Sequence, residues 1–398
     1  MADYIKLFET HAEYNTYANS NDMLKPNVSF CSDKKEVHFN PWTWADEYMQ
    51  TVALEDGTIS FNILRSMGTD MIASISYSTD NGETWTTTNN TNEKSENIQI
   101  SVNVQTGDKV LWKGDAKQLG FYDYDENVDN YVGSFFSSTC EFDAKGNIMS
   151  LIYGDNYKNN TTIEYNGQFV RLFNDYEERL ECNVVNAKDL SLPATILTEY
   201  CYNNMFGNCT SLETAPEFPV ASLATNCYNN MFGNCTSLAT APQLPSTSLA
   251  SACYAGMFFG CTSLTTAPEL PATTLEQNCY CAMFQGCTSL TTPPKLHSTT
   301  LETYCYYHMF LGCTSLVIAP ELPATTLPIH CYDGMFSGCT SLNYIKAMFT
   351  TTPSSSYTND WVKNVSSNGT FVKNSAAEWN VTGNDAIPEN WTVETASA

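Results

Sequence analysis

The chain repeats one short motif, which first occurs as Cys201-Tyr202-Asn203-Asn204-Met205-Phe206-Gly207-Asn208-Cys209-Thr210-Ser211-Leu212. Its first cysteine recurs at Cys227, Cys253, Cys279, Cys305 and Cys331, and its second recurs at Cys235, Cys261, Cys287, Cys313 and Cys339. Both series keep a period of 26 residues without an insertion. A fixed period of this length is typical of stacked supersecondary units, because one such unit cannot bury its own apolar face. The sequence therefore predicts a solenoid of six units over residues 198–342.

Within each unit the apolar residues have helical spacing. Cys279, Met283 and Cys287 are four residues apart, which places them on one face of a short helix. The residue before the second cysteine is a good helix stop, because asparagine and glycine readily take the left-handed conformation; these residues are Asn208, Asn234, Gly260, Gly286, Gly312 and Gly338. An extended run such as 265–271 follows, and its prolines limit strand pairing. We expect one helix and one short strand in each unit.

The run from Met257 to Leu275 resembles the BspA-like leucine-rich repeats of gut-bacterial surface proteins and their phages. The resemblance covers residues 201–342, although the period of 26 residues and the additional prolines differ from the shorter family repeats. It implies an α/β leucine-rich-repeat solenoid that serves for display or adhesion without catalysis. Residues 1–40 resemble the start of structural proteins of crAss-like phages, which implies an anchor to a virion at the capsid or the tail.

Turn signals divide the rest of the chain. We expect a multidomain protein with an attachment segment at 1–40, a β-rich, sandwich-like domain at 41–165, a repeat cap at 166–197, the leucine-rich-repeat solenoid at 198–342 and a C-terminal cap at 343–398. Runs such as Thr58–Leu64 and Ile98–Val104 have strand composition, and Ile148–Tyr153 is expected to be an apolar strand.

Residues Ser78, Asp80, Gly82, Thr84 and Trp85 match an Asp-box, Ser-x-Asp-x-Gly-x-Thr-Trp. This pattern predicts a hairpin turn in which the aspartate bonds the loop backbone and the glycine takes a strained angle. Asp-boxes also occur in sialidases, but the chain has too few arginines to clamp a carboxylate substrate.

The composition disfavours several functions. With 43 acidic and 18 basic residues the net charge is −25, so the chain should repel nucleic acid. We find no apolar run long enough for a membrane span. The first residues lack the apolar core of a signal peptide, which favours a virion protein assembled in the host cytoplasm over an exported one. No catalytic motif and no cofactor motif is recognised, so we expect no enzyme activity.

The repeated cysteines are expected to be free thiols that act as small buried hydrophobes, with oxidised pairs as the alternative. Zinc is poorly supported, because no histidine accompanies them at regular spacing. A weak calcium candidate consists of alternating oxygen ligands, for which a solvated acidic loop is the default interpretation; its residues are Asp123, Asp125, Asn127 and Asp129.

Large apolar residues after the last repeat, such as Trp361, Trp379 and Trp391, are expected to cover the open core of the final unit. The alternative is a tryptophan platform on which glycans stack. Histidines such as His308 and His330 lie in variable repeat positions, where we expect surface residues.

Taken together, these features favour a virion surface protein, either a head or tail fibre or a capsid decoration subunit. It would contact other virion proteins through its N-terminal region and a host-surface glycan or protein through its repeats, and we expect a homo-oligomer. The expected ligand-facing residues lie on the strand face of the repeats and are Glu213, Thr214, Thr265, Thr266, Thr291 and Thr292. The alternatives are a bacterial cell-surface adhesin and a fibre-borne, glycan-processing enzyme.

Overall fold

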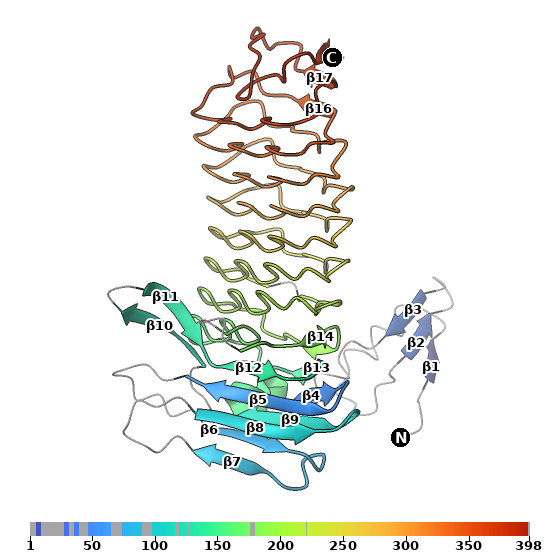
Figure 1. The fold of residues 1–398 in the computed structure, drawn as a ribbon, viewed down its shortest axis with the longest axis vertical. Coiled ribbons are helices and arrows are strands. Elements are labelled where there is room, and N and C mark those ends of the chain that lie inside the picture. Colours follow the sequence, from blue (N-terminus) through green and yellow to red (C-terminus); the bar gives the residue numbers. More distant parts are fainter. Residues whose placement is uncertain are drawn as a thin grey trace.

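The computed structural model describes residues 5–8, 28–31, 36–39, 47–64, 74–89, 98–115, 119–125, 128–175, 180–219 and 221–396. Of these, 5–8, 28–31, 36–39, 121–125 and 128–132 are described by their backbone alone. The described part is rich in β-strands, and its only α-helix is the short α2 (Ser150–Tyr153), followed by the 3-10 helix η2 (Gly154–Asn159). A β-sheet region lies at one end of a tall stack of coils (Figure 1).

Two sheets meet at the base of the stack. One has the order β12 (Phe135–Ser138), β5 (Gly57–Ile63), β8 (Ile98–Val104). The other has the order β14 (Val184–Asn186), β13 (Phe142–Asn147), β4 (Met49–Ala53), β9 (Lys109–Gly114), β6 (Ser74–Ser78), β7 (Thr86–Asn89), with β15 (Leu190–Ser191) beside β13. Aromatic rings fill the space between them, because Phe136 lies 4.7 Å from Phe61 of its own sheet and 5.3 Å from Trp112 of the other.

Most of the strand predictions in this region are confirmed. Strand β8 spans the predicted residues, and β5 is displaced by one residue from the predicted 58–64. The strand predicted for Ile148–Tyr153 is wrong, because these residues form a turn and then α2. Ser150 ties this segment to the sheet: its hydroxyl donates to the Trp112 carbonyl and accepts the Met49 N–H.

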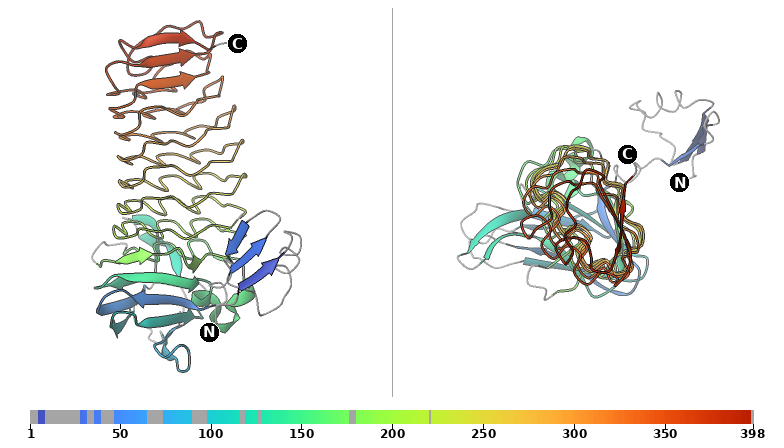
Figure 2. Two further views of the ribbon diagram at one scale, coloured as in Figure 1. Left: turned by 90° about the vertical axis from the view of Figure 1, so that its right-hand side faces the viewer. Right: turned by 90° about the horizontal axis from the view of Figure 1, so that it is seen from above.

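Three smaller groups of strands complete the β structure. Strands β1 (Ile5–Phe8), β2 (Val28–Cys31) and β3 (Glu36–Phe39) form one sheet, while much of the predicted attachment segment lies outside the described residues. Strands β10 (Gly120–Asp125) and β11 (Val128–Gly133) form a hairpin. At the far end of the stack, β16 (Tyr344–Ala347), β17 (Thr370–Lys373) and β18 (Thr392–Thr395) form a parallel sheet (Figure 2).

The coils of residues 198–342 are held together by a regular alternation of backbone hydrogen bonds. The N–H of Ala282 donates to Tyr307 of the next coil at 2.7 Å, and the N–H of Phe284 donates to Met309 at 2.9 Å. Between them, the Met283 N–H donates to Tyr280 within its own coil. Figure 2 shows that successive coils superpose as a column when seen from above.

The helix predicted for each repeat is therefore wrong, since the described residues of 198–342 contain no α-helix. The helix is absent because a left-handed residue occurs at every fourth position, as at Asn278, Ala282 and Gly286, where φ is 57°, 53° and 76°. A left-handed residue interrupts the N–H to C=O ladder of a helix and frees amides for the neighbouring coil. Only the last of these three positions was recognised in the sequence as a left-handed stop.

The prediction of which residues face inward is nevertheless confirmed. All twelve repeated cysteines are buried. The phenylalanine rings from Phe206 to Phe336 stack at 5.6–5.7 Å with interplanar angles of 5–12°. A parallel column of tyrosines runs from Tyr202 to Tyr332 at 5.5–6.1 Å. Each such ring pair contributes about 0.5–1.5 kcal/mol beyond its buried area.

The phenylalanine column continues into the β-sheet region. Phe173 stacks on Phe206 at 4.7 Å and also on Phe136 of β12 at 5.4 Å. The predicted repeat cap is thus a degenerate coil, with Phe169 stacked on Tyr202 as the tyrosine equivalent. Asp175 of this cap is only 7% exposed and accepts the Leu180 N–H. The sheets and the coils share one continuous core.

Tryptophans close the far end of the stack, and the alternative of a glycan platform is wrong. Trp361 is fully buried against Phe336, and Trp379 and Trp391 are each 6% exposed. The indole N–H of Trp361 donates to the Ala386 carbonyl, which ties the last loop over the core. The aliphatic stem of Lys373 is buried too, and its ammonium donates to the carbonyls of residues 377 and 379.

Replacing Ala282 with glycine tests the left-handed backbone. Glycine removes the steric cost of φ 53° at this position, so we expect the free energy of unfolding to rise by about 0.5–1 kcal/mol. The matched control is Ala255→Gly, at a position where φ is negative. We expect this change to lower the free energy of unfolding by about 0.5–1 kcal/mol. The midpoint of urea unfolding measures both variants. Destabilisation by Ala282→Gly, as in a helix interior, would contradict the observed backbone.

Candidate functional site

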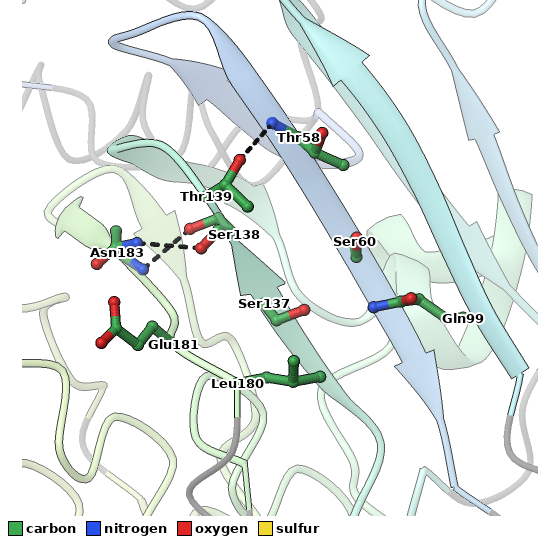
Figure 3. Close-up of a pocket in the computed structure, with 9 residues that line it drawn as sticks. All are labelled: Thr58, Ser60, Gln99, Ser137, Ser138, Thr139, Leu180, Glu181 and Asn183. Atoms are coloured by element: carbon green, nitrogen blue, oxygen red, sulfur yellow. Dashed lines mark hydrogen bonds between the residues drawn. The ribbon is translucent and has the colours of Figure 1, made fainter.

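A polar groove lies where the β-sheet region meets the first coils. It has a volume of about 410 Å³ and is lined by Thr58, Ser60, Gln99, Ser137, Ser138, Thr139, Leu180, Glu181 and Asn183. The lining comes from β5, β8, the end of β12 and the segment that leads to β14 (Figure 3). Ser60 and Ser137 are each 5% exposed and form its floor, while Gln99, Leu180 and Glu181 are exposed at its rim.

The groove exists because β5 and β8 alternate between apolar and uncharged polar residues. In β5, Ile59, Phe61 and Ile63 are buried between the two sheets. The residues between them face the opposite side and pair across strands: Ser60 bonds Ser101 of β8 at 2.9 Å, and Asn62 donates to Ser137 of β12 at 2.9 Å. Period-two alternation puts all of these polar groups on one face of the sheet.

Backbone contacts fix the wall of the groove. The Ser138 N–H donates to the Glu181 carbonyl at 2.9 Å. Asn183 donates twice to Ser138, from its backbone N–H to the hydroxyl and from its amide to the carbonyl, both at 3.0 Å. The dashed lines in Figure 3 mark this pair of bonds and the bond from the Thr58 N–H to the Thr139 hydroxyl. Bonds at the Glu181 carbonyl and at Asn183 therefore hold Glu181 beside β12.

The predicted ligand-facing residues form a separate surface on the stack. Glu213, Thr265, Thr266, Thr291 and Thr292 are exposed. Thr266 pairs with Thr292 through a parallel bridge, so these hydroxyls form columns along the stack.

Thr214 differs from the others, because it is half-buried and its hydroxyl donates to Asn186 at 2.9 Å. None of the six lines the groove.

The two cysteine columns have different roles. In the second column each thiol donates to a phenylalanine carbonyl of the preceding coil, as Cys235 does to Phe206 and Cys261 does to Phe232, both at 3.1 Å. Cys209 makes the same bond to Phe173 at 3.2 Å. These sulfurs are free thiols rather than disulfides, and each adds a hydrogen bond between two coils.

Burial also makes these thiols chemically inert. It raises the pKa of Cys253 in the first column and of Cys261 in the second to about 12. The thiolate is the reactive form of cysteine, so a raised pKa suppresses nucleophilic attack and metal binding at neutral pH. The columns are therefore structural.

The Asp-box forms the predicted turn. Asp80 accepts the hydroxyl of Ser78 at 2.6 Å, the hydroxyl of Thr84 and the backbone N–H of Thr84 at 2.9 Å, and these bonds lower its pKa to about 2. Gly82 has φ 89°. Trp85 packs on Tyr48 at 5.1 Å with the Lys113 ammonium 4.1 Å from its ring, so the box supports the sheet.

The calcium candidate lies in part outside the described residues. Asp123, Asp125 and Asp129 belong to the hairpin of β10 and β11, in which Asp123 pairs with Asn130 and Asp125 pairs with Val128. Asn127 lies outside the described residues. Among the residues the structure describes, no group of three or more histidine, cysteine, aspartate or glutamate side chains is placed to hold a metal ion.

The two repeat histidines are half-buried rather than on the open surface. The Nδ1 of His330 lies 2.5 Å from a carboxylate oxygen of the buried Asp333. Burial lowers the pKa of His308, whose ring stacks on Tyr307.

The helices of the described part are all too short or too polar to cross a membrane. Comparison with protein-family models, curated proteins and solved structures finds no match to this chain.

The groove was missed by the sequence analysis. Its lining comes from four segments that are far apart in the chain, around 58–60, 99, 137–139 and 180–183. The available signal was the run of uncharged polar residues at alternate positions of β5 and β8, which indicates a polar sheet face but not a hollow.

Stability should fall steeply in alkali. The unfolded chain loses thiol protons above the ordinary pKa of 9.0, whereas Cys253 and Cys261 keep theirs until about 12. Each such thiol therefore contributes its full stabilisation below pH 9. As the pH rises above 9, that thiol lowers the free energy of unfolding by about 1.4 kcal/mol per pH unit.

Urea unfolding between pH 8 and pH 11 measures this slope. Cys261→Ala should reduce the slope by the contribution of one proton, whereas Thr262→Ala at the exposed neighbouring position should leave the slope unchanged. Equal slopes in the wild type and Cys261→Ala would show that this thiol ionises as freely in the folded protein as in the unfolded one.

Proposed function

We propose that the chain is a non-enzymatic virion surface protein of a gut-bacterial phage, a head or tail fibre or a capsid decoration subunit. The observation that carries this proposal is the layout of the molecule, in which a rod of stacked coils extends from a β-sheet base (Figure 1). Buried tryptophans close the far end of the rod. The β1–β3 strands lie at the base, where an anchor to a larger particle would act.

The stack is a variant of the BspA-like leucine-rich-repeat solenoid in this proposal. Its support is the repeat sequence of residues 201–342 together with the in-register columns of cysteine, tyrosine and phenylalanine. The variant differs in having turns with left-handed residues in place of a helix. Such a stack has no reactive thiol in its core, which suits long exposure outside a cell.

The repeats contact the host surface through the exposed hydroxyl columns, and the acidic surface keeps densely displayed copies from aggregating. Host contact is with a glycan or a protein, and the protein acts as a homo-oligomer on the particle.

Detection in purified particles tests the location. A chain lacking residues 1–46 should still form the stack but should be lost from virions, because the anchor is removed. Quantitative mass spectrometry of gradient-purified particles measures both forms. Recovery only in a bacterial envelope fraction would instead support the cell-surface adhesin.

The hydroxyl columns are tested by replacing Thr265, Thr266, Thr291 and Thr292 with alanine. These side chains are exposed and the fold loses one exposed hydroxyl bond, from Thr291 to the Thr265 carbonyl, so the stack should still form, while adsorption of the phage to host cells should fall by about tenfold. The control Thr299→Ala/Thr300→Ala changes equally exposed hydroxyls of another column and should adsorb normally. Normal adsorption by the fourfold variant would remove this face from the proposal.

A further inference from the structure

The groove beside the first coils carries almost no charge. Glu181 is its one charged lining residue, in a protein whose net charge is −25. The other polar groups are hydroxyls and amides, and one apolar side chain, Leu180, is 43% exposed at the rim. Its volume of 410 Å³ falls within the range of about 300–1,000 Å³ for ligand sites, and its lining is more polar than that of most such sites.

Two groups at the rim are available to a ligand. The Gln99 amide and the Glu181 carboxylate make no hydrogen bond with any side chain or backbone group that the structure describes. Figure 3 shows Gln99 extending from β8 across β5 toward the floor of the groove. On the floor, the Ser137 hydroxyl accepts from Asn62 and keeps its own proton to donate. The groove thus offers an amide, a carboxylate and hydroxyls within one small space.

This set of groups selects among ligand classes. A sugar hydroxyl both donates and accepts, so it matches an amide, a carboxylate and a serine hydroxyl at once. The exposed Leu180 side chain provides a surface for the C–H face of a ring. An anion is disfavoured, because Glu181 and the acidic protein repel it and no lining cation compensates.

We propose that this groove binds a neutral sugar residue of a glycan, with Glu181 and Gln99 bonding its hydroxyls and Leu180 packing on its ring. The inference rests on the proposed host contact for its biological setting, and it adds a glycan site at the base of the molecule to the surface formed by the columns of the stack. The groove is built from β5, β8, the end of β12 and residues 180–183, and the apolar residues that alternate with the polar ones in β5 and β8 belong to the core.

Calorimetric titration of the full chain tests the proposal. The probes are the methyl glycosides of glucose, galactose, mannose, fucose, N-acetylglucosamine and N-acetylgalactosamine, with glucuronic acid and glucose 6-phosphate as anionic counterparts. We expect at least one neutral glycoside to bind and the anions not to bind. Gln99→Ala and Glu181→Gln should each weaken that binding by about tenfold, the effect of losing one good hydrogen bond.

The matched controls are Gln277→Ala and Glu269→Gln, which make the same chemical changes at exposed positions of the stack and should leave the affinity unchanged. All four positions are exposed, so melting temperatures should be equal and a loss of binding would not reflect unfolding.

Three results would overturn the groove assignment: no binding of any neutral glycoside, tighter binding of an anion, or binding that the two groove variants leave intact. Binding that is lost only when Thr265 and Thr291 are replaced would overturn the groove while supporting the columns of the proposed function. Groove-dependent binding by a protein absent from virions would support the groove and reject the proposed location.

Discussion

The structure depends on backbone hydrogen bonds between successive coils. In each coil, alternate backbone N–H groups donate to carbonyls of the next coil, as the Tyr280 N–H does to the Cys305 carbonyl. The N–H groups between them close turns within their own coil. This alternation requires a left-handed residue at every fourth position, which costs about 1–2 kcal/mol where the residue is not glycine, as at Ala282 and His308. Each inter-coil bond returns about 1 kcal/mol, and stacking of the aromatic columns adds to it. Equal coil length follows, because one inserted residue would break the alternation in both neighbours.

The same constraint explains how far the sequence could be interpreted. The inward residues could be predicted because turns with a left-handed residue every fourth position repeat their faces at nearly the spacing of a helix. The backbone could not, since Ala252, Ala282 and Tyr304 are left-handed residues of types that rarely adopt this conformation. Strand β8 was predicted to the residue from its alternation, whereas 148–153 was misassigned because a short apolar run does not distinguish strand from helix. The groove needed the tertiary arrangement of four segments.

The chemistry of the core and that of the surface are sharply separated. The repeated cysteine, tyrosine and phenylalanine side chains are buried in the stack. The S–H groups of the second cysteine column donate hydrogen bonds that link neighbouring coils. Uncharged hydroxyls and amides instead lie on the outside, in columns along the stack and in the groove at its base. Strand β12 joins the two regions, because its Phe136 stacks on Phe173 of the degenerate coil and its Ser138 N–H donates to the Glu181 carbonyl in the groove wall. Columns of hydroxyls along the side of the stack and a polar groove at its base suit the display on a particle that we propose.

Scalar coupling across hydrogen bonds, measured by NMR on a deuterated chain, tests the inter-coil bonding most directly. The account predicts a coupling from the amide nitrogen of Ala282 to the carbonyl carbon of Tyr307, and from Phe284 to Met309, with Met283 coupled to Tyr280 of its own coil. A coupling from Ala282 to Asn278, four residues earlier, would mean that the repeat forms a helix and would contradict the account.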